Sequence, residues 1–103
     1  MAKYLLAYKG GGMAQSEAER EAAMAAWGAW MGGLGAALTD GGNPFGPSKA
    51  MAADGTLGDG ASSALTGYSI LQADDFAAAA ELAKGCPIFA SGGSIDIYEA
   101  LPM

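Results

Sequence analysis

Lys3-Tyr4-Leu5-Leu6-Ala7-Tyr8, rich in aromatic and branched side chains, predicts a first β-strand that ends at Gly10-Gly11-Gly12. Ser16-Glu17-Ala18-Glu19 then has the pattern of a capping box, in which the Ser16 hydroxyl accepts a hydrogen bond from the Glu19 amide. After it, residues at helical spacing form one stripe: Arg20, Met24, Trp27, Trp30, Met31 and Leu34. The chain therefore begins with a strand and an amphipathic helix.

Turn and capping residues divide the rest of the chain. Gly32-Gly33 and Gly35 are expected to end the first helix. The elements predicted after it are a strand at 36–39, a hairpin turning at Asp54-Gly55, a strand at 65–71, a helix capped by Asp74 and ending near Gly85, and a strand at 94–101. This order predicts one α+β domain, residues 1–103, of the ferredoxin-like (split βαβ) type. Its two helices are expected on one face of a mainly antiparallel sheet.

Alternation along the strands predicts which side chains the helices leave uncovered. The side chains expected to face the helices are those of Leu5, Ala7, Ile95 and Ile97. Those expected on the opposite face are Tyr4, Leu6, Tyr8, Tyr68, Ile70, Asp96 and Tyr98. A face that holds all four tyrosines would be a large apolar patch, and a second copy of the same sheet would cover it. We therefore predict a homodimer through this tyrosine-rich sheet face.

The acidic composition narrows the classes of partner. The 11 Asp and Glu residues against 5 Lys and Arg give a net charge of −6, which disfavours nucleic acid and anionic membrane surfaces as partners. No apolar run reaches membrane-spanning length, and a strand-like run without the features of a signal peptide stands at the start. We expect a cytoplasmic protein with no membrane or nucleic-acid partner.

The absence of histidine excludes several chemistries. Without it there is no Ser-His-Asp or Cys-His catalysis, no histidine-ligated zinc and no ordinary proton shuttle near neutral pH. Cys86 stands alone between Gly85 and Pro87, which favours a small buried apolar residue over a nucleophile. We expect neither a metal nor a cofactor.

The segment Thr39-Asp-Gly-Gly-Asn-Pro-Phe-Gly-Pro-Ser-Lys49 holds the candidates for a functional site. Its prolines and glycines exclude a helix, and a rigid polar loop at a strand end is a common place for a site. Asp40 is the candidate catalytic residue, with the alternative that its carboxylate caps the Gly41-Gly42 turn. The candidate ligand-binding residues are Tyr8, Asn43, Ser48 and Lys49. Trp27 and Trp30 could stack on a planar ligand, although a helical stripe of this kind is more often core.

Several segments together resemble the YCII-related proteins, a group that overlaps the DGPF-domain proteins within the dimeric α/β-barrel superfamily. They are Lys3 to Tyr8, Trp27-Gly-Ala-Trp30 with Leu34-Gly35, Asp40-Gly-Gly-Asn-Pro44, Gly67-Tyr-Ser-Ile70, Ala83-Lys-Gly-Cys-Pro87 and Gly92-Gly-Ser-Ile-Asp-Ile-Tyr-Glu99. The resemblance covers essentially the whole chain and implies a ferredoxin-like domain whose sheet pairs with a second copy. Some members are suspected enzymes because of a histidine–aspartate pair. Here Asp40 is present, but Met24 or Trp27 occupies the helix region of that histidine.

Two functions follow as hypotheses. The first is binding of an unknown small molecule in a pocket between the first helix, the second strand and the sheet, with an enzyme-like activity independent of histidine as an extension. The second is a non-catalytic interaction or regulatory module, in which the loop at 39–49 serves assembly.

Overall fold

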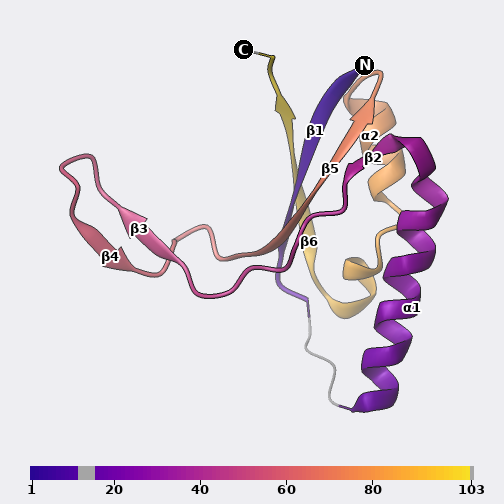
Figure 1. Ribbon diagram of the computed structural model, residues 1–103, viewed down its shortest axis with the longest axis horizontal. Coiled ribbons are helices and arrows are strands. Elements are labelled where there is room, and N and C mark those ends of the chain that lie inside the picture. The colour runs from indigo at the N-terminus through magenta and orange to yellow at the C-terminus, as the bar shows by residue number, and fades with distance from the viewer. Residues whose placement is uncertain (12–15, 103) are drawn as a thin grey trace.

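The computed structural model describes residues 1–11 and 16–102. The elements are β1 (Ala2–Lys9), α1 (Glu17–Leu34), η1 (Gly35–Ala37), β2 (Leu38–Asp40), β3 (Lys49–Met51), β4 (Leu57–Asp59), β5 (Leu65–Ala73), α2 (Phe76–Ala83), η2 (Pro87–Ser91) and β6 (Ser94–Ala100). Within this part of the chain, one sheet has the order β2-β5-β1-β6 with antiparallel neighbours, and β3 pairs with β4 in a separate hairpin (Figure 1). The chain is an α+β protein compatible with a ferredoxin-like fold.

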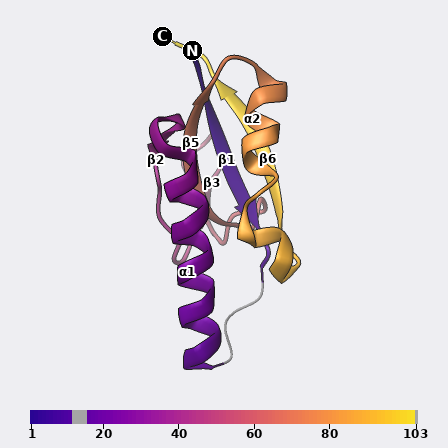
Figure 2. The same cartoon turned by 90° about the vertical axis from the view of Figure 1, so that its right-hand side faces the viewer.

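Both helices lie on the same face of the sheet, side by side, as predicted (Figure 2). Between helices and sheet lies a core whose buried members are Leu6, Tyr8, Leu71, Ala83, Cys86 and Ile88. A second cluster near the start of α2 joins Tyr4, Ala73 and Ala79. Large side chains on the central strands meet alanines on α2, so strand residues supply most of the core volume here.

The predicted facing of β1 is wrong by one residue. Tyr4 and Leu6 are buried in the helix-facing clusters, with 2% and 0% of their surfaces exposed, and Tyr8 is buried with them. Leu6 and Tyr8 share a cluster with Ala83 of α2, and Tyr4 shares one with Ala79. Large β1 side chains thus fill the space beside the small side chains of α2, and Tyr8 also packs against Trp27 of α1. The Tyr4 ring also packs edge-on against Phe76, with ring centroids 5.0 Å apart. Leu5 is consequently on the other side of the sheet.

The face away from the helices, which we call the open face, is defined by direct pairing across the strands. Leu5 lies opposite Ile70 and Tyr98, and Ala7 lies opposite Tyr68 and Asp96. The predicted positions of the β5 and β6 residues on this face are therefore confirmed. Of the four tyrosines expected there, Tyr68 and Tyr98 remain. Ile95 and Ile97 pack against the helix-side core, as predicted.

Several element boundaries depart from the predicted ones. Helix α1 runs through Gly32-Gly33, which do not end it, and stops at Leu34 with Gly35 as its C-cap at φ 54°, as expected for Gly35. The second strand begins at Leu38 instead of 36, because residues 35–37 form the 3-10 turn η1. Asp75, not Asp74, caps α2: its carboxylate accepts a hydrogen bond from the Ala78 amide at 2.8 Å. Helix α1 and strand β5 thus extend further along the chain than predicted, and the elements after them begin later.

Two local predictions are confirmed. The Ser16 hydroxyl accepts from the Glu19 amide at 3.1 Å and starts α1. The hairpin turns at Asp54-Gly55, where Gly55 has φ 90° and the Asp54 carboxylate accepts from the Thr56 amide at 2.9 Å. This hydrogen bond holds the pKa of Asp54 below its usual range. Gly12, the last glycine of the turn predicted after β1, lies outside the described residues.

The β3–β4 hairpin projects away from the sheet and from both helices (Figure 1). Every residue from Lys49 to Asp59 is exposed, including Met51 and Leu57. The cavity described below thus lies in the part of the protein formed by the four-stranded sheet and the helices packed on it. Among the described residues, no helix combines the length and the apolar character that crossing a membrane requires.

Candidate functional site

A cavity of about 580 Å³ opens between α1 and the sheet, beside the end of β1, the start of β5 and the loop that follows β2. We call it the α1 cavity. Its lining residues are Tyr8, Gly10, Gly11, Arg20, Ala23, Met24, Trp27, Met31, Gly41, Gly42, Asn43, Pro44, Thr66, Gly67, Tyr68, Ile88 and Ser91. Its volume lies within the range of small-molecule sites in proteins, about 300–1,000 Å³.

The aromatic wall of the cavity is fixed from behind. The Trp27 ring meets the Tyr8 ring edge-on, with centroids 5.2 Å apart, and meets Trp30 edge-on at 5.8 Å. Trp30 is itself anchored, because its indole N–H donates to the Leu82 carbonyl of α2 at 3.0 Å. Trp30 is therefore a core residue. Trp27, which is half-buried, packs on the core and also lines the cavity. Edge-to-face pairs of this kind hold ring planes in defined orientations.

The Tyr8 hydroxyl is committed to the protein. It donates to the Ser69 hydroxyl at 2.7 Å, and Ser69 donates in turn to the Gly41 carbonyl at 2.8 Å. Burial raises the pKa of Tyr8 to about 12, with a smaller opposing effect of the Ser69 hydrogen bond and a raising effect of the neighbouring Cys86. Tyr8 is thus neutral at physiological pH. Its ring lines the cavity, and its hydroxyl, through Ser69, links β1 to β5 and to the loop after β2.

The loop at residues 40–45 is tied to β5 and forms one rim of the cavity. Pro44 forms a β-bridge with Gly67, and the Phe45 amide donates to the Thr66 carbonyl at 2.9 Å. Gly42 has φ 73°, and a Cβ there would overlap the Tyr68 carbonyl oxygen. Glycine is required at this position both for its backbone conformation and for the close approach of the loop to strand β5.

The Asp40 carboxylate is engaged in the same loop. Its Oδ1 accepts a hydrogen bond from the Gly42 amide at 2.9 Å, which is the turn-capping arrangement considered for this residue. The Asp40 side chain is exposed, and Asp40 is not among the residues that line the α1 cavity. In this arrangement Asp40 shapes the rim without reaching the interior.

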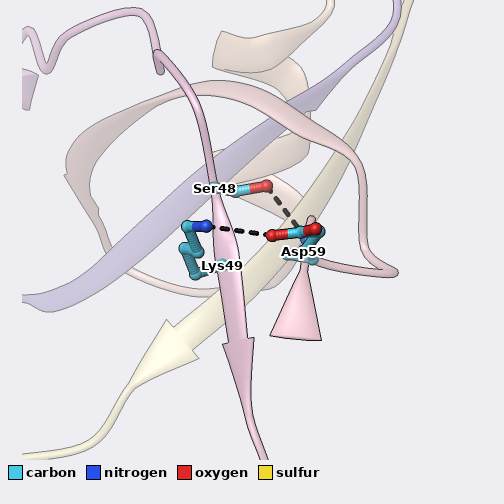
Figure 3. A network of polar contacts seen from close by, with 4 residues as sticks. Ser48, Lys49 and Asp59 are labelled. Atoms are coloured by element: carbon cyan, nitrogen blue, oxygen red, sulfur yellow. Dashed lines mark hydrogen bonds and ion pairs between the residues drawn. The ribbon is translucent and has the colours of Figure 1, made fainter. Parts of the chain in front are cut away.

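The predicted ligand-binding residues separate into two groups. Tyr8 and Asn43 both line the α1 cavity, so the structure brings them together. Ser48 and Lys49 lie outside the lining, at the base of the β3–β4 hairpin (Figure 3). There the Lys49 amine pairs with the Asp59 carboxylate at 2.9 Å, and the Ser48 hydroxyl accepts from the Ala61 amide at 2.9 Å. These bonds close the hairpin.

The polar groups that line the cavity differ in whether their hydrogen bonds are already made. Thr66 donates to the carbonyls of Tyr8 and Gly10 at 3.2 Å, and Ser91 donates to the Ile88 carbonyl at 3.0 Å. Within residues 1–11 and 16–102, the Arg20 guanidinium, the Trp27 indole N–H, the Asn43 side-chain amide and the Tyr68 hydroxyl have no hydrogen-bond or ion-pair partner. These groups remain to meet a ligand.

Cys86 is buried next to Tyr8, as predicted for a small core residue. Burial raises the pKa of its thiol, so it stays protonated and unreactive near neutral pH. Among the described residues, no group of three or more His, Cys, Asp and Glu side chains is placed to hold a metal ion. The cavity therefore presents aromatic and thioether surfaces together with a few polar groups that have no partner among the described residues.

Sequence reasoning missed Arg20, Met31, Thr66 and Ile88 as lining residues. A signal for the first two was present, since Arg20, Met24, Trp27 and Met31 follow each other at spacings of four, three and four residues on one helix face. Thr66 and Ile88 carry no comparable signal, because only the folded chain brings them to α1.

Comparison of the chain with family models, with curated proteins and with solved structures gave no match.

Proposed function

We propose that this protein binds a small, largely apolar molecule in the α1 cavity. The observation that carries the proposal is the cavity's aromatic and thioether wall, held in place by the Trp30–Leu82 and Tyr8–Ser69 hydrogen bonds. A preformed wall lowers the ordering cost of binding, because its side chains do not have to be immobilised when the ligand arrives. The few free polar groups then orient the ligand.

Thermal-shift screening of a chemically diverse library tests this proposal. Met24 lines the cavity and is 70% exposed, so Met24→Glu should place a carboxylate at the wall without disturbing the core. Met51 on the hairpin is 71% exposed and outside the cavity, and Met51→Glu is therefore a matched control. Compounds that stabilise the wild type and Met51→Glu, but not Met24→Glu, support the proposal. A library without such compounds contradicts it.

An enzyme-like activity would be an extension of the same site. Its acid–base group would be Asp40, the candidate catalytic residue, which would have to exchange the Gly42 amide for a substrate. Tyr8 does not serve as the base, because its pKa of about 12 keeps it protonated. We accordingly propose binding as the primary activity of the cavity.

A second candidate function is assembly with a second copy of this chain through the open face. The helices cover only the other face, and this face presents half-buried Tyr68 and Ile70 together with Tyr98, which is 58% exposed. Phe45 extends the apolar surface by stacking on Tyr68 with centroids 5.7 Å apart. A face-to-face pair of sheets would bury on the order of 1,000 Å², enough for a specific interface.

This assembly is the dimeric α/β-barrel arrangement that resemblance to the YCII-related and DGPF-domain proteins implies, and we propose membership of that group on the same basis. The strand order β2-β5-β1-β6 supports the split βαβ plan that the group implies. Sedimentation equilibrium at micromolar concentration tests assembly. We expect a dimer that Tyr98→Asp dissociates, while Phe76→Asp on the helix side leaves it intact. A monomeric wild type would contradict it.

A further inference from the structure

We infer that the ligand of the α1 cavity carries one anionic group, a carboxylate, at one end of an apolar body, and that Arg20 recognises it. This inference rests on the proposed binding function and specifies its ligand class. It starts from the charges of the lining. Among the described lining residues there is one cation, Arg20, and no Asp or Glu.

That charge distribution departs from the rest of the molecule. The chain has 11 acidic and 5 basic residues, so a surface region of this size without any acid and with a cation is unlike the average. Three of the other four Lys and Arg residues are paired, Lys9 with Asp96, Lys49 with Asp59 and Lys84 with Glu81, at 2.9, 2.9 and 2.7 Å, and the fourth, Lys3, does not line the cavity. The Arg20 guanidinium has no such partner among residues 1–11 and 16–102.

The hydrogen-bond inventory of the cavity points the same way. The hydroxyl groups of Tyr8, Thr66 and Ser91 already donate to protein acceptors. The side-chain donors without a partner among the described residues are the guanidinium N–H groups of Arg20, the indole N–H of Trp27, the amide N–H groups of Asn43 and the hydroxyl of Tyr68. Asn43 also offers an acceptor oxygen, whereas the Arg20 guanidinium can only donate. A planar carboxylate matches that guanidinium fork with two parallel bonds.

The remainder of the lining sets the body of the ligand. Trp27, Met24 and Met31 present aromatic and thioether surface along the same face of α1. Such surface contributes through burial of apolar area and disfavours an unpaired charge, so the anionic group belongs at the Arg20 end. A ligand with a carboxylate at the Arg20 end and an aromatic or aliphatic body along α1 satisfies both parts of the site.

A different role for Arg20 would be to offset the negative charge at the start of α1, where Glu17 and Glu19 lie in the first turn. The two roles predict different responses. Charge balance changes the stability of the protein by the same amount whichever ligand is offered. Recognition changes the ratio of affinities between an acid and its neutral amide.

Isothermal titration calorimetry with 4-phenylbutanoate and octanoate, each beside its neutral amide, separates these cases. For the wild type we expect the acids to bind about tenfold more tightly than their amides, as a charge-assisted bidentate pair provides. Arg20→Gln should remove that preference and leave the amides unchanged. Arg20→Lys should keep part of it, because the charge remains and the fork is lost. Lys3→Gln, which removes a cation outside the cavity, should retain the full preference.

Each outcome is informative. Equal binding of acids and amides by the wild type would overturn this inference while leaving the proposed binding function in place. An acid preference that survives in Arg20→Gln would overturn the role of Arg20. Failure of all four compounds to bind, while other members of the screened library bind at the cavity, overturns the ligand class alone. Failure of every compound, library included, removes the binding function as well.

Discussion

Gly42→Ala tests the close contact between the loop after β2 and strand β5. Gly42 has φ 73°, and an added Cβ would overlap the Tyr68 carbonyl oxygen and lie 2.6 Å from the carbonyl carbon. The left-handed conformation costs about 1–2 kcal/mol for a residue with a side chain. Relieving the overlap requires the loop and strand to move apart, which costs about 1–3 kcal/mol in a well-packed region. We expect a total destabilisation of about 2–5 kcal/mol.

Urea unfolding followed by tryptophan fluorescence measures this loss. For a domain whose total stability is about 5–15 kcal/mol, the expected change should shift the unfolding midpoint well beyond experimental error. Gly46→Ala is the matched control, because nothing lies within 4 Å of a Cβ at Gly46 and its φ is not positive. We expect that control within about 0.5 kcal/mol of the wild type. If Gly42→Ala behaved like Gly46→Ala, the described packing of loop against strand would be refuted.

Two further predictions concern α1 and Tyr8. Gly28 lies in the exposed middle of α1, and nothing lies within 4 Å of a Cβ added there. Gly28→Ala should therefore stabilise the protein by about 1 kcal/mol in the same urea assay. An unchanged unfolding midpoint would contradict the helical placement of Gly28. Because the pKa of Tyr8 is about 12 in the fold against about 10 in the unfolded chain, its buried phenol contributes stability in full below pH 10, and that contribution is lost as the pH rises from 10 to 12. The wild type should therefore lose about 2–3 kcal/mol more than Tyr8→Phe over this interval, and parallel pH profiles of unfolding would argue against burial of the hydroxyl.

Much of the architecture could be predicted from the sequence because local signals carry it. The Ser16–Glu19 cap and the Asp54-Gly55 turn each depend on residues close in sequence, and both are present as expected. The facing of β1 could not be predicted in this way. Both alternations, Tyr4-Leu6-Tyr8 and Leu5-Ala7, are apolar, and the choice depends on how much space the alanines of α2 leave above the strand.

The site was predicted in part for a related reason. The rigid loop after β2 was located from its glycines and prolines, and Asn43 does line the α1 cavity. Ser48 and Lys49, only a few residues further on, belong to the projecting hairpin. The sequence could not reveal that the chain turns away from the sheet between these positions. Nor could it place Ile88 opposite α1, since that contact joins segments distant in sequence.

Binding of a small molecule in the α1 cavity is decided most clearly by a two-dimensional ¹H–¹⁵N NMR titration of the wild type with the strongest stabiliser from the thermal-shift screen. Glycine amides serve as reporters in both regions. Gly11, Gly41, Gly42 and Gly67 line the cavity, whereas Gly55, Gly58 and Gly60 lie on or beside the hairpin. We expect saturable shifts for the cavity glycines and none for the hairpin glycines. Shifts spread equally over both groups, or confined to the hairpin, would contradict it.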